Sequence, residues 1–446
     1  MKSIFADLVV VGAGPCGFVT ALSAIRQGLN VILIDKRAFP GGVISGSGVN
    51  SLLTFHSLKG HKIIEGIPQE IIDGLVSIGA SLGHIRDTVG VAWSVTPISP
   101  SAFSTYIISK CKTEKINLQT NCEFQSVITE EVCHETKRIK SIYCLKDRQP
   151  LKISAPLFVD ASGEGVLGES AGAELLPMND DTKMPMTLIF NMGNVDISEV
   201  LKYIDKNKDE FHHETLWDEI QNSKIIGVSG FFSLWKSAKL SVPRDRVLFY
   251  QTLNKNEVSI NSTRIFANSK EPYTEAMEQV SEISGFLKEK IPGFRDSFIS
   301  NIYPFIGIRE GRRLKGHYCL TEEDVLYGKR FPNEIAFGGF PIDIHSSKND
   351  NLKSVSLQGD GFYGIPYGTL VSSNIENLFI AGKCFSAEFS AHASARVQAT
   401  VMALGQAVGI SAGICIKNNI LPINVCIDKL RSKLLDDGCI LNPVIL

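Results

Sequence analysis

The chain has 446 residues, of which 44% are hydrophobic and 21% are charged, and its formal net charge is −2 at pH 7. This length predicts two or three domains with a large buried core, which excludes a fibre, a small disulfide-bonded scaffold and a largely disordered chain. The near-neutral charge gives no sign of a partner such as nucleic acid or an anionic membrane.

The ten cysteines are scattered, with no CxxC pair and no Cys/His cluster at zinc spacing. We therefore predict no metal site and expect mostly buried thiols in a reducing compartment. Residues 11–17 interrupt the apolar N-terminal run with three glycines and a proline, which favours a strand and a turn over a signal peptide. The longest apolar stretch, residues 401–416, contains Gln406 and several glycines and is too short to span a bilayer. We expect a cytoplasmic protein.

The chain opens with a β-rich run over residues 5–11, the string GAGPCG, a helical segment over residues 18–27 and an apolar strand over residues 30–34. This order is typical of a doubly wound parallel sheet. The glycines of the string permit a tight turn, and they let backbone N–H groups approach a pyrophosphate at the start of the helix. Asp35 follows the second strand, where a carboxylate accepts hydrogen bonds from a ribose hydroxyl. The segment therefore predicts dinucleotide binding.

Two features favour FAD over NAD as the dinucleotide. The chain contains three GxGxxG strings, at residues 12–17, 163–168 and 359–364, but only the first belongs to a strand, turn, helix and strand unit that ends at an acidic residue. It also has an antiparallel meander pattern over residues 118–129, 139–145 and 151–159, which runs into the string VDASG. This extension is typical of FAD domains.

Long strings in a fixed order carry a family resemblance: GAGPCG, FPGGVISGSGVNSLLTFH, GIPQEIIDGLVSIGAS, VDASGEGVLGESAGAE, IGIREGRRLKGHYCLTEEDV, FGGFPIDIH, YGIPYGTLVSSNIENLFIAGKCFS and ARVQATVMALGQAVG. On these strings the sequence resembles the FAD-dependent oxidoreductases of the glutathione-reductase/succinate-dehydrogenase superfamily, and within it a broad microbial branch. The resemblance implies an α/β fold, with a Rossmann-like FAD-binding domain, a three-stranded β-meander and an inserted mixed α+β substrate domain. We expect the FAD-binding domain over residues 1–175 and 371–446, and the substrate domain over residues 176–370.

The motif and the resemblance together imply a set of FAD-binding residues. The superfamily closes its FAD domain with Gly-Asp or Gly-Glu, whereas this chain has Gly382-Lys383, so we expect the lysine to contact phosphate or ribityl oxygens. The helix that follows should aim its N-terminus at the flavin. The expected FAD-binding residues are Gly12, Gly14, Pro15, Cys16, Gly17, Asp35, Lys36, Gly42, Val127, Ala161, Gly163, Gly382, Lys383, Ala399 and Thr400.

Candidates for the substrate side begin with Asp343 and His345, which share one face of a predicted strand. The carboxylate would orient the imidazole and raise its basicity, as an acid/base residue requires. His56 follows the glycine-rich segment, and His392 precedes the closing helix. Arg396 starts that helix, where the resemblance implies contact with a substrate carboxylate or carbonyl.

Arg309, Arg312 and Arg313 form a basic cluster with two alternative interpretations. Their guanidiniums would clamp an anionic substrate or a flavin phosphate, or they would form an ion-pair network between domains. His212 and His213 lie in a charged stretch over residues 202–219 that is typical of a solvated helix.

The predicted function is FAD-dependent oxidation or reduction of a small-molecule substrate, by hydride transfer between a substrate carbon and flavin N5. NAD(P)H, oxygen, a quinone and a carrier protein remain open as the electron partner, and covalent attachment of FAD stays open. The alternatives are a flavin monooxygenase, a redox-neutral flavoenzyme and a non-catalytic protein with the FAD fold. The absence of a Cys-x4-Cys string after the first helix excludes that form of the disulfide-reductase mechanism. The substrate, the direction of the reaction and the oligomeric state do not follow from the sequence.

Overall fold

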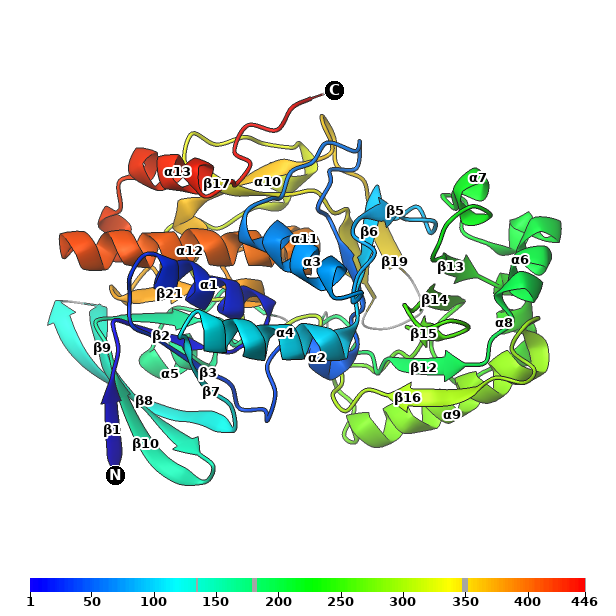
Figure 1. Cartoon of the computed structure of the whole chain (residues 1–446), viewed down its shortest axis with the longest axis horizontal. Helices are drawn as coiled ribbons and strands as arrows, with labels where there is room; N and C mark the ends of the chain where they lie inside the picture. The colour runs from blue at the N-terminus through cyan, green and yellow to red at the C-terminus, as the bar shows by residue number, and fades with distance from the viewer. Residues whose placement is uncertain (134, 179–182, 347–351, 446) are drawn as a thin grey trace.

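The structure is a computed structural model that describes residues 1–133, 135–178, 183–346 and 352–445. It has a larger lobe that contains both ends of the chain and a smaller lobe from the middle of the chain (Figure 1). The larger lobe is built on a parallel five-stranded sheet with the strand order β21-β11-β2-β3-β7. Its strands are β21 (Leu378–Ile380), β11 (Leu157–Asp160), β2 (Leu8–Val11), β3 (Val31–Ile34) and β7 (Asn117–Gln119).

The central strands of this sheet are buried at every position, because helices or other strands cover both faces. This burial explains the short, continuous runs of valine, leucine and isoleucine that the sequence shows there. α1 (Pro15–Arg26) connects β2 to the parallel strand β3 and begins with a proline, whose missing N–H costs nothing in the first turn. The predicted α/β fold with a Rossmann-like domain is confirmed.

A second sheet of the larger lobe contains the predicted three-stranded antiparallel meander as β8, β9 and β10. β1 extends it to four strands in the order β1-β10-β9-β8 by pairing with β10 in parallel. The expected strand over residues 151–159 divides between two sheets, because Pro156 has no N–H to donate and separates β10 from β11. The strands are β1 (Lys2–Phe5), β8 (Cys122–Cys133), β9 (Thr136–Lys146) and β10 (Gln149–Ser154).

α12 (Gln398–Asn418) packs along α1 and joins the two ends of the chain (Figure 1). Its glycines at 405, 409 and 413 recur every four residues and therefore face α1. A Cβ atom at Gly409 would lie 2.5 Å from Cβ of Ser23 and 2.6 Å from the carbonyl oxygen of Thr20. Only glycine permits so close an approach of the two helices.

α12 has the length and composition of a membrane span, but 89% of its most apolar window is buried inside the molecule. This burial is typical of a core helix of a globular protein. The remaining helices of the larger lobe are α2 (Gly42–Ser47), α3 (Ile67–Ser77), α4 (Pro100–Thr113), α5 (Val166–Ala171), α10 (Glu322–Leu326), α11 (Phe389–Ala395) and α13 (Ile427–Asp436). Its short sheets contain β4 (Ser51–Leu53), β5 (Ile85–Arg86), β6 (Ser94–Pro97), β17 (Glu334–Gly338), β20 (Tyr363–Pro366), β18 (Ile342–His345) and β19 (Leu352–Val355).

The smaller lobe has its own apolar core, formed by residues between Met186 and Ile306. Residues 314–370, which we expected in the substrate domain, instead supply side chains such as Leu320 and Tyr363 to the core of the larger lobe. An antiparallel sheet in the order β13-β14-β15-β12-β16 carries the smaller lobe. Its strands are β12 (Phe190–Gly193), β13 (Gly227–Gly230), β14 (Val247–Gln251), β15 (Val258–Ile260) and β16 (Phe298–Ile302), and its helices are α6 (Ile197–Lys206), α7 (Trp217–Ile220), α8 (Phe232–Ala238) and α9 (Pro272–Lys290).

The contact between α1 and α12 can be tested with two glycine-to-alanine substitutions. Gly409→Ala inserts a methyl group between the helices, and we expect it to lower the free energy of unfolding by about 1–3 kcal/mol. Gly285→Ala in α9 is the matched control, because no atom lies within 4 Å of its added Cβ. Alanine is the better helix former, so this control should be unchanged or more stable by about 0.5–1 kcal/mol. Urea unfolding followed by circular dichroism measures both, and equal stability of the two variants contradicts the packing argument.

Candidate functional site

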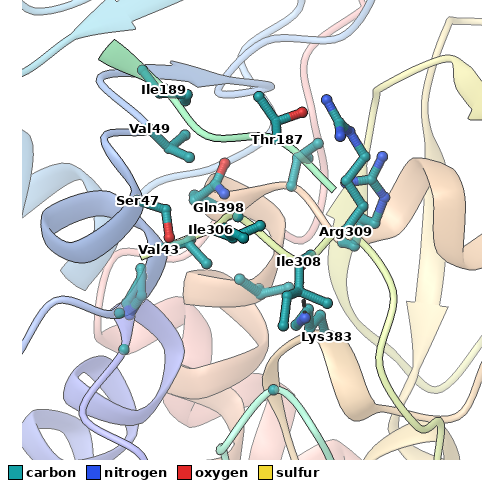
Figure 2. A pocket seen from close by; sticks show the side chains of 18 of the residues that line it. Val43, Ser47, Val49, Thr187, Ile189, Ile306, Ile308, Arg309, Lys383 and Gln398 are labelled. Atoms are coloured by element: carbon teal, nitrogen blue, oxygen red, sulfur yellow. Dashed lines mark hydrogen bonds between the residues drawn. The ribbon is translucent and has the colours of Figure 1, made fainter. Parts of the chain in front are cut away.

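A cavity of about 530 Å³ lies where the two lobes meet. Its wall combines the loops at the carboxyl ends of β2, β3 and β11 with residues of the smaller lobe and the start of α12. This is the crevice in which open parallel sheets bind ligands. Figure 2 shows part of the wall, where side chains from segments far apart in the sequence surround one space: Val43, Ser47, Val49, Thr187, Ile189, Ile306, Ile308, Arg309, Lys383 and Gln398.

The glycine loop at the start of α1 leaves room for a ligand beside the backbone. Gly12 has φ +107°, and a Cβ atom there would lie 2.5 Å from the carbonyl oxygen of Ala161, so it must be glycine. At Gly14 an added Cβ would meet only the Cα of Gly42, at 3.8 Å, so its backbone is open to the cavity. Gly17 lies inside the loop against Gly12 and does not line the cavity.

Asp35 shapes this loop from the end of β3. Its Oδ2 accepts a hydrogen bond from the Ala13 N–H at 2.9 Å, and its Oδ1 accepts one from the Arg37 N–H at 2.9 Å. Burial raises the pKa of this carboxyl group, and the two backbone N–H groups oppose the rise. A carboxylate oxygen has a second lone pair, so Asp35 can still accept from a ligand in the cavity that it lines.

Lys383 lies on the cavity wall next to the glycine loop. Its Nζ donates a hydrogen bond to the Ile308 carbonyl at 2.8 Å, and burial lowers its pKa to about 8. The Cys16 thiol is buried under the loop, and burial raises its pKa to about 12, so it is a packing residue and no thiolate nucleophile. The expected residues that line the cavity are Gly12, Gly14, Pro15, Cys16, Asp35, Lys36, Gly42, Ala161, Gly163, Gly382 and Lys383.

Besides Gly17, three further expected nucleotide contacts do not line the cavity. Val127 packs in the core of the larger lobe, and the cavity is reached by Cys122, Glu123 and Phe124 at the beginning of the same strand. Ala399 and Thr400 are fully buried. Gln398 and Val401 line the cavity in their place, because positions three apart in a helix share a face.

The other part of the cavity contains the pair Asp343 and His345 from β18. Their side chains lie on one side of the strand, with Nε2 of His345 3.1 Å from Oδ2 of Asp343. Burial lowers the pKa of His345 to about 4, although the carboxylate opposes this. Burial alone would raise the pKa of Asp343, but the charges of His345, Arg396 and Arg309 outweigh it and hold that pKa well below its usual range. Arg396 Nη2 lies 3.8 Å from the same carboxylate oxygen.

The basic cluster of the sequence is divided in the structure. Arg309 lines the cavity, and its Nη1 donates to the Pro185 carbonyl at 2.6 Å. Arg312 instead pairs with Glu169 at 2.7 Å. Arg313 is buried and donates to backbone carbonyls, including that of Ala387 at 3.0 Å.

Arg244, Arg246 and Arg264 of the smaller lobe also line the cavity, and the sequence analysis missed them. They flank the strands β14 and β15, and no local motif marks them. Most arginines of a protein lie on its surface, and nothing in the sequence distinguishes these three from surface arginines.

Three histidines, two of them candidate site residues, lie in other places than we expected. His56 lies outside the cavity wall, and its Nδ1 is 2.8 Å from Oγ of Ser94. His392 is fully buried and its Nε2 donates to the Lys383 carbonyl at 2.7 Å, so it supports the cavity wall from behind. His212 is no part of a helix, because α6 ends at Lys206, and it lines the cavity.

The comparisons with known proteins agree with this geometry. The family model described as FAD dependent oxidoreductase matches residues 7–434. The chain belongs to the FAD-dependent oxidoreductase family. FAD is therefore its cofactor, and the protein is an oxidoreductase.

Curated relatives match short segments of this flavoprotein. Thioredoxin reductase of Ureaplasma parvum is 41% identical over 73 residues, which are 16% of this chain and 23% of that protein. The probable fumarate reductase Ifc3 of Shewanella frigidimarina is 49% identical over 50 residues, which are 11% of this chain and 8% of that protein. The chain thus spans less than a quarter of the length of either relative.

Solved structures of low identity share the fold of the flavoprotein. A geranylgeranyl bacteriochlorophyll reductase-like protein of Thermoplasma acidophilum has a TM-score of 0.51 and 12% identity, over 98% of this chain and 85% of that one. p-Nitrophenol 4-monooxygenase of Pseudomonas putida has a TM-score of 0.50 and 10% identity, over 98% of this chain and 84% of that one.

The residues of the glycine loop fit the cofactor of the family. The open backbone at Gly14 and the N-terminus of α1 suit a pyrophosphate, and the free lone pairs of Asp35 suit a ribose hydroxyl. The loop, Lys36, Gly42 and Lys383 would hold FAD along the cavity.

Asp35→Ala tests the nucleotide part of the cavity. We expect FAD to bind about 10- to 100-fold more weakly, because hydrogen bonds to a charged group are worth roughly 1.5–3 kcal/mol. Asp7→Ala is the matched control, because Asp7 also accepts a backbone N–H, from Asn30 at 2.8 Å, but lies away from the cavity. Titration of the apoprotein with FAD, followed by fluorescence, measures the dissociation constants. An unchanged constant in Asp35→Ala contradicts the placement of FAD.

Proposed function

We propose that the protein oxidises or reduces a small organic molecule by hydride transfer between a substrate carbon and flavin N5, with His345 as the acid/base residue. The observation that carries the proposal is the hydrogen-bonded pair of Asp343 and His345 in the same cavity as the glycine loop. FAD supplies the acceptor or donor of the hydride when it is bound.

The Asp343 carboxylate determines which nitrogen of His345 is available. An ionised carboxylate only accepts hydrogen bonds, so Nε2 of His345 carries the proton in their 3.1 Å contact. Nδ1 is then the nitrogen that accepts a proton. When the substrate loses a hydride from carbon, His345 accepts the proton that leaves the heteroatom on that carbon. In the reverse direction His345 returns this proton.

Arg396 holds the other side of Asp343. Its Nη2 lies 3.8 Å from the carboxylate and 3.8 Å from Sδ of Met184, and its Nε is buried with no hydrogen-bond partner among the described residues. An unsatisfied buried donor of this kind costs free energy unless a ligand accepts from it. Arg396 is therefore the residue that we expect to position the substrate next to His345.

The proposal is tested by anaerobic reduction of the holoenzyme with a panel of hydroxy acids, amino acids and alcohols. We expect the flavin absorbance to bleach with one class, and His345→Ala to slow this step by about 100- to 10,000-fold with unchanged FAD content. His317→Ala, at an exposed histidine outside the cavity wall, is the control. Bleaching of His345→Ala at the wild-type rate contradicts the role of His345. If NAD(P)H and oxygen are both required and the product gains an oxygen atom, the enzyme is a monooxygenase and the hydride proposal is wrong.

The pH dependence of the same reaction follows from the lowered pKa of His345. The groups that face His345 are Asp343, which raises its pKa, and Arg309 and Arg244, which lower it together with burial. Because the pKa is about 4, the neutral, proton-accepting form persists from alkaline pH down to about pH 5. The second-order rate of flavin reduction should be level over this range. It should then fall about tenfold per pH unit below pH 4, measured by stopped flow. A fall centred near pH 6.5 contradicts the proposed base.

A further inference from the structure

The arginines around His345 outnumber the carboxylates that face them. Arg244, Arg309 and Arg396 line this part of the cavity, and among the described residues the Asp343 carboxylate faces all three. Glu310 also faces Arg396, but it is paired with Arg313 at 3.8 Å. Asp245 is already paired with Arg246 through two hydrogen bonds of 2.7 Å. The neutral state of His345 adds no charge.

The contacts of Arg309 and Arg244 position them without neutralising them. Arg309 donates to the backbone carbonyl of Pro185 at 2.6 Å. Among the described residues, no carboxylate lies within 4 Å of Arg309 or Arg244, and Nε of Arg244 is buried with no hydrogen-bond partner there. A backbone carbonyl satisfies one donor but leaves the positive charge in place.

The positive charges also act on one another. Burial lowers the pKa of Arg309 to about 9, with the charges of Arg396, Arg244 and Arg264 contributing and Asp343 opposing. Burial likewise lowers the pKa of Arg244 to about 10, with Arg264 and Arg246 contributing. Such mutual repulsion is relieved when an anion binds between the guanidiniums.

The flavin pyrophosphate does not account for this arginine group. The glycine loop and the N-terminus of α1, on the larger lobe, suit the pyrophosphate. Arg396 is instead paired with Asp343 on β18, and the charges of Arg309 and Arg244 lower the pKa of His345 on the same strand. The group is therefore assembled around the proposed acid/base pair.

We propose that the substrate is a small organic acid with at least two oxyanion groups, bound by Arg244, Arg309 and Arg396 beside His345. This inference rests on the proposed function, because it assigns the substrate class of that same site. Carboxylates and phosphates both match the planar, bidentate geometry of guanidinium, so the shared chemistry is the oxyanion. Two such groups leave the surplus of positive charge nearly balanced.

Equilibrium binding to the oxidised holoenzyme tests the inference without turnover. The probes are succinate, 3-phosphoglycerate and the uncharged succinamide, followed by calorimetry and by changes in the flavin absorbance. We expect an anion to bind and succinamide not to bind. Arg309→Gln and Arg244→Gln should weaken that anion about 10- to 100-fold. Arg312→Gln is the matched control, because Arg312 is paired with Glu169 and lies outside the cavity wall, and it should change the affinity less than twofold. Arg309→Lys keeps the charge and serves if the glutamine variant does not fold; it should weaken binding less than tenfold.

Each outcome bears on one of the two proposals. Equal binding of succinamide, an equal loss of affinity in Arg312→Gln, or loss of FAD from Arg309→Gln overturns the anion site. If succinate binds and 3-phosphoglycerate does not, both substrate groups are carboxylates, and the reverse result shows that one of them is a phosphate. If anion binding depends on Arg309 but no compound of the panel bleaches the flavin, the anion site stands and the proposed hydride transfer is wrong. If only a neutral compound bleaches the flavin, the hydride transfer stands and the anion site is wrong.

Discussion

The side-by-side contact of α1 and α12 is the constraint on which the cavity depends. It joins segments nearly four hundred positions apart in the chain, and Oγ of Ser23 donates across it to the Gln406 carbonyl at 2.9 Å. Because glycines line the contact, the helices approach closely enough for the glycine loop before α1 and the first turn of α12 to face one cavity. A bulkier contact would separate these two walls. The small residues that give α12 the composition of a membrane span thus also permit the close helix contact on which the cavity depends.

Most residues that the sequence predicted for nucleotide binding line the cavity, and those around the glycine loop do so because that part of the chain is local. A strand, a glycine loop, a helix and Asp35 follow one another within about thirty residues, and their geometry follows from backbone chemistry. In the wrong predictions there, the helix or strand is correct but the residue that faces the cavity is displaced along it. Ala399 and Thr400 were expected where Gln398 and Val401 lie, and Val127 was expected where the start of the same strand lies. Sequence pattern identifies an element more reliably than the exact residue that faces a ligand.

The substrate part was predicted less completely because it is assembled from distant segments. Asp343 and His345 were found, since alternation along a strand places them together. Arg244 and Arg264 were not, because they reach the cavity only through the docking of the smaller lobe on the larger one. Conversely, Arg309, Arg312 and Arg313 are neighbours in sequence but point to three different partners. Adjacency in the chain is weak evidence for a shared site.

The anion site and the acid/base residue are coupled by charge. Arg309 and Arg244 lower the pKa of His345 in the free protein, next to the larger effect of burial. A bound oxyanion that neutralises these guanidiniums removes that contribution, while the hydrogen bond from Nε2 to Asp343 stays. The pKa of His345 then rises from about 4 toward its ordinary value, so the imidazole becomes a stronger base only when the substrate is present. Burial and the arginines together thus keep His345 neutral before binding, and under the two proposals the bound anion raises the basicity of His345 for the proton transfer.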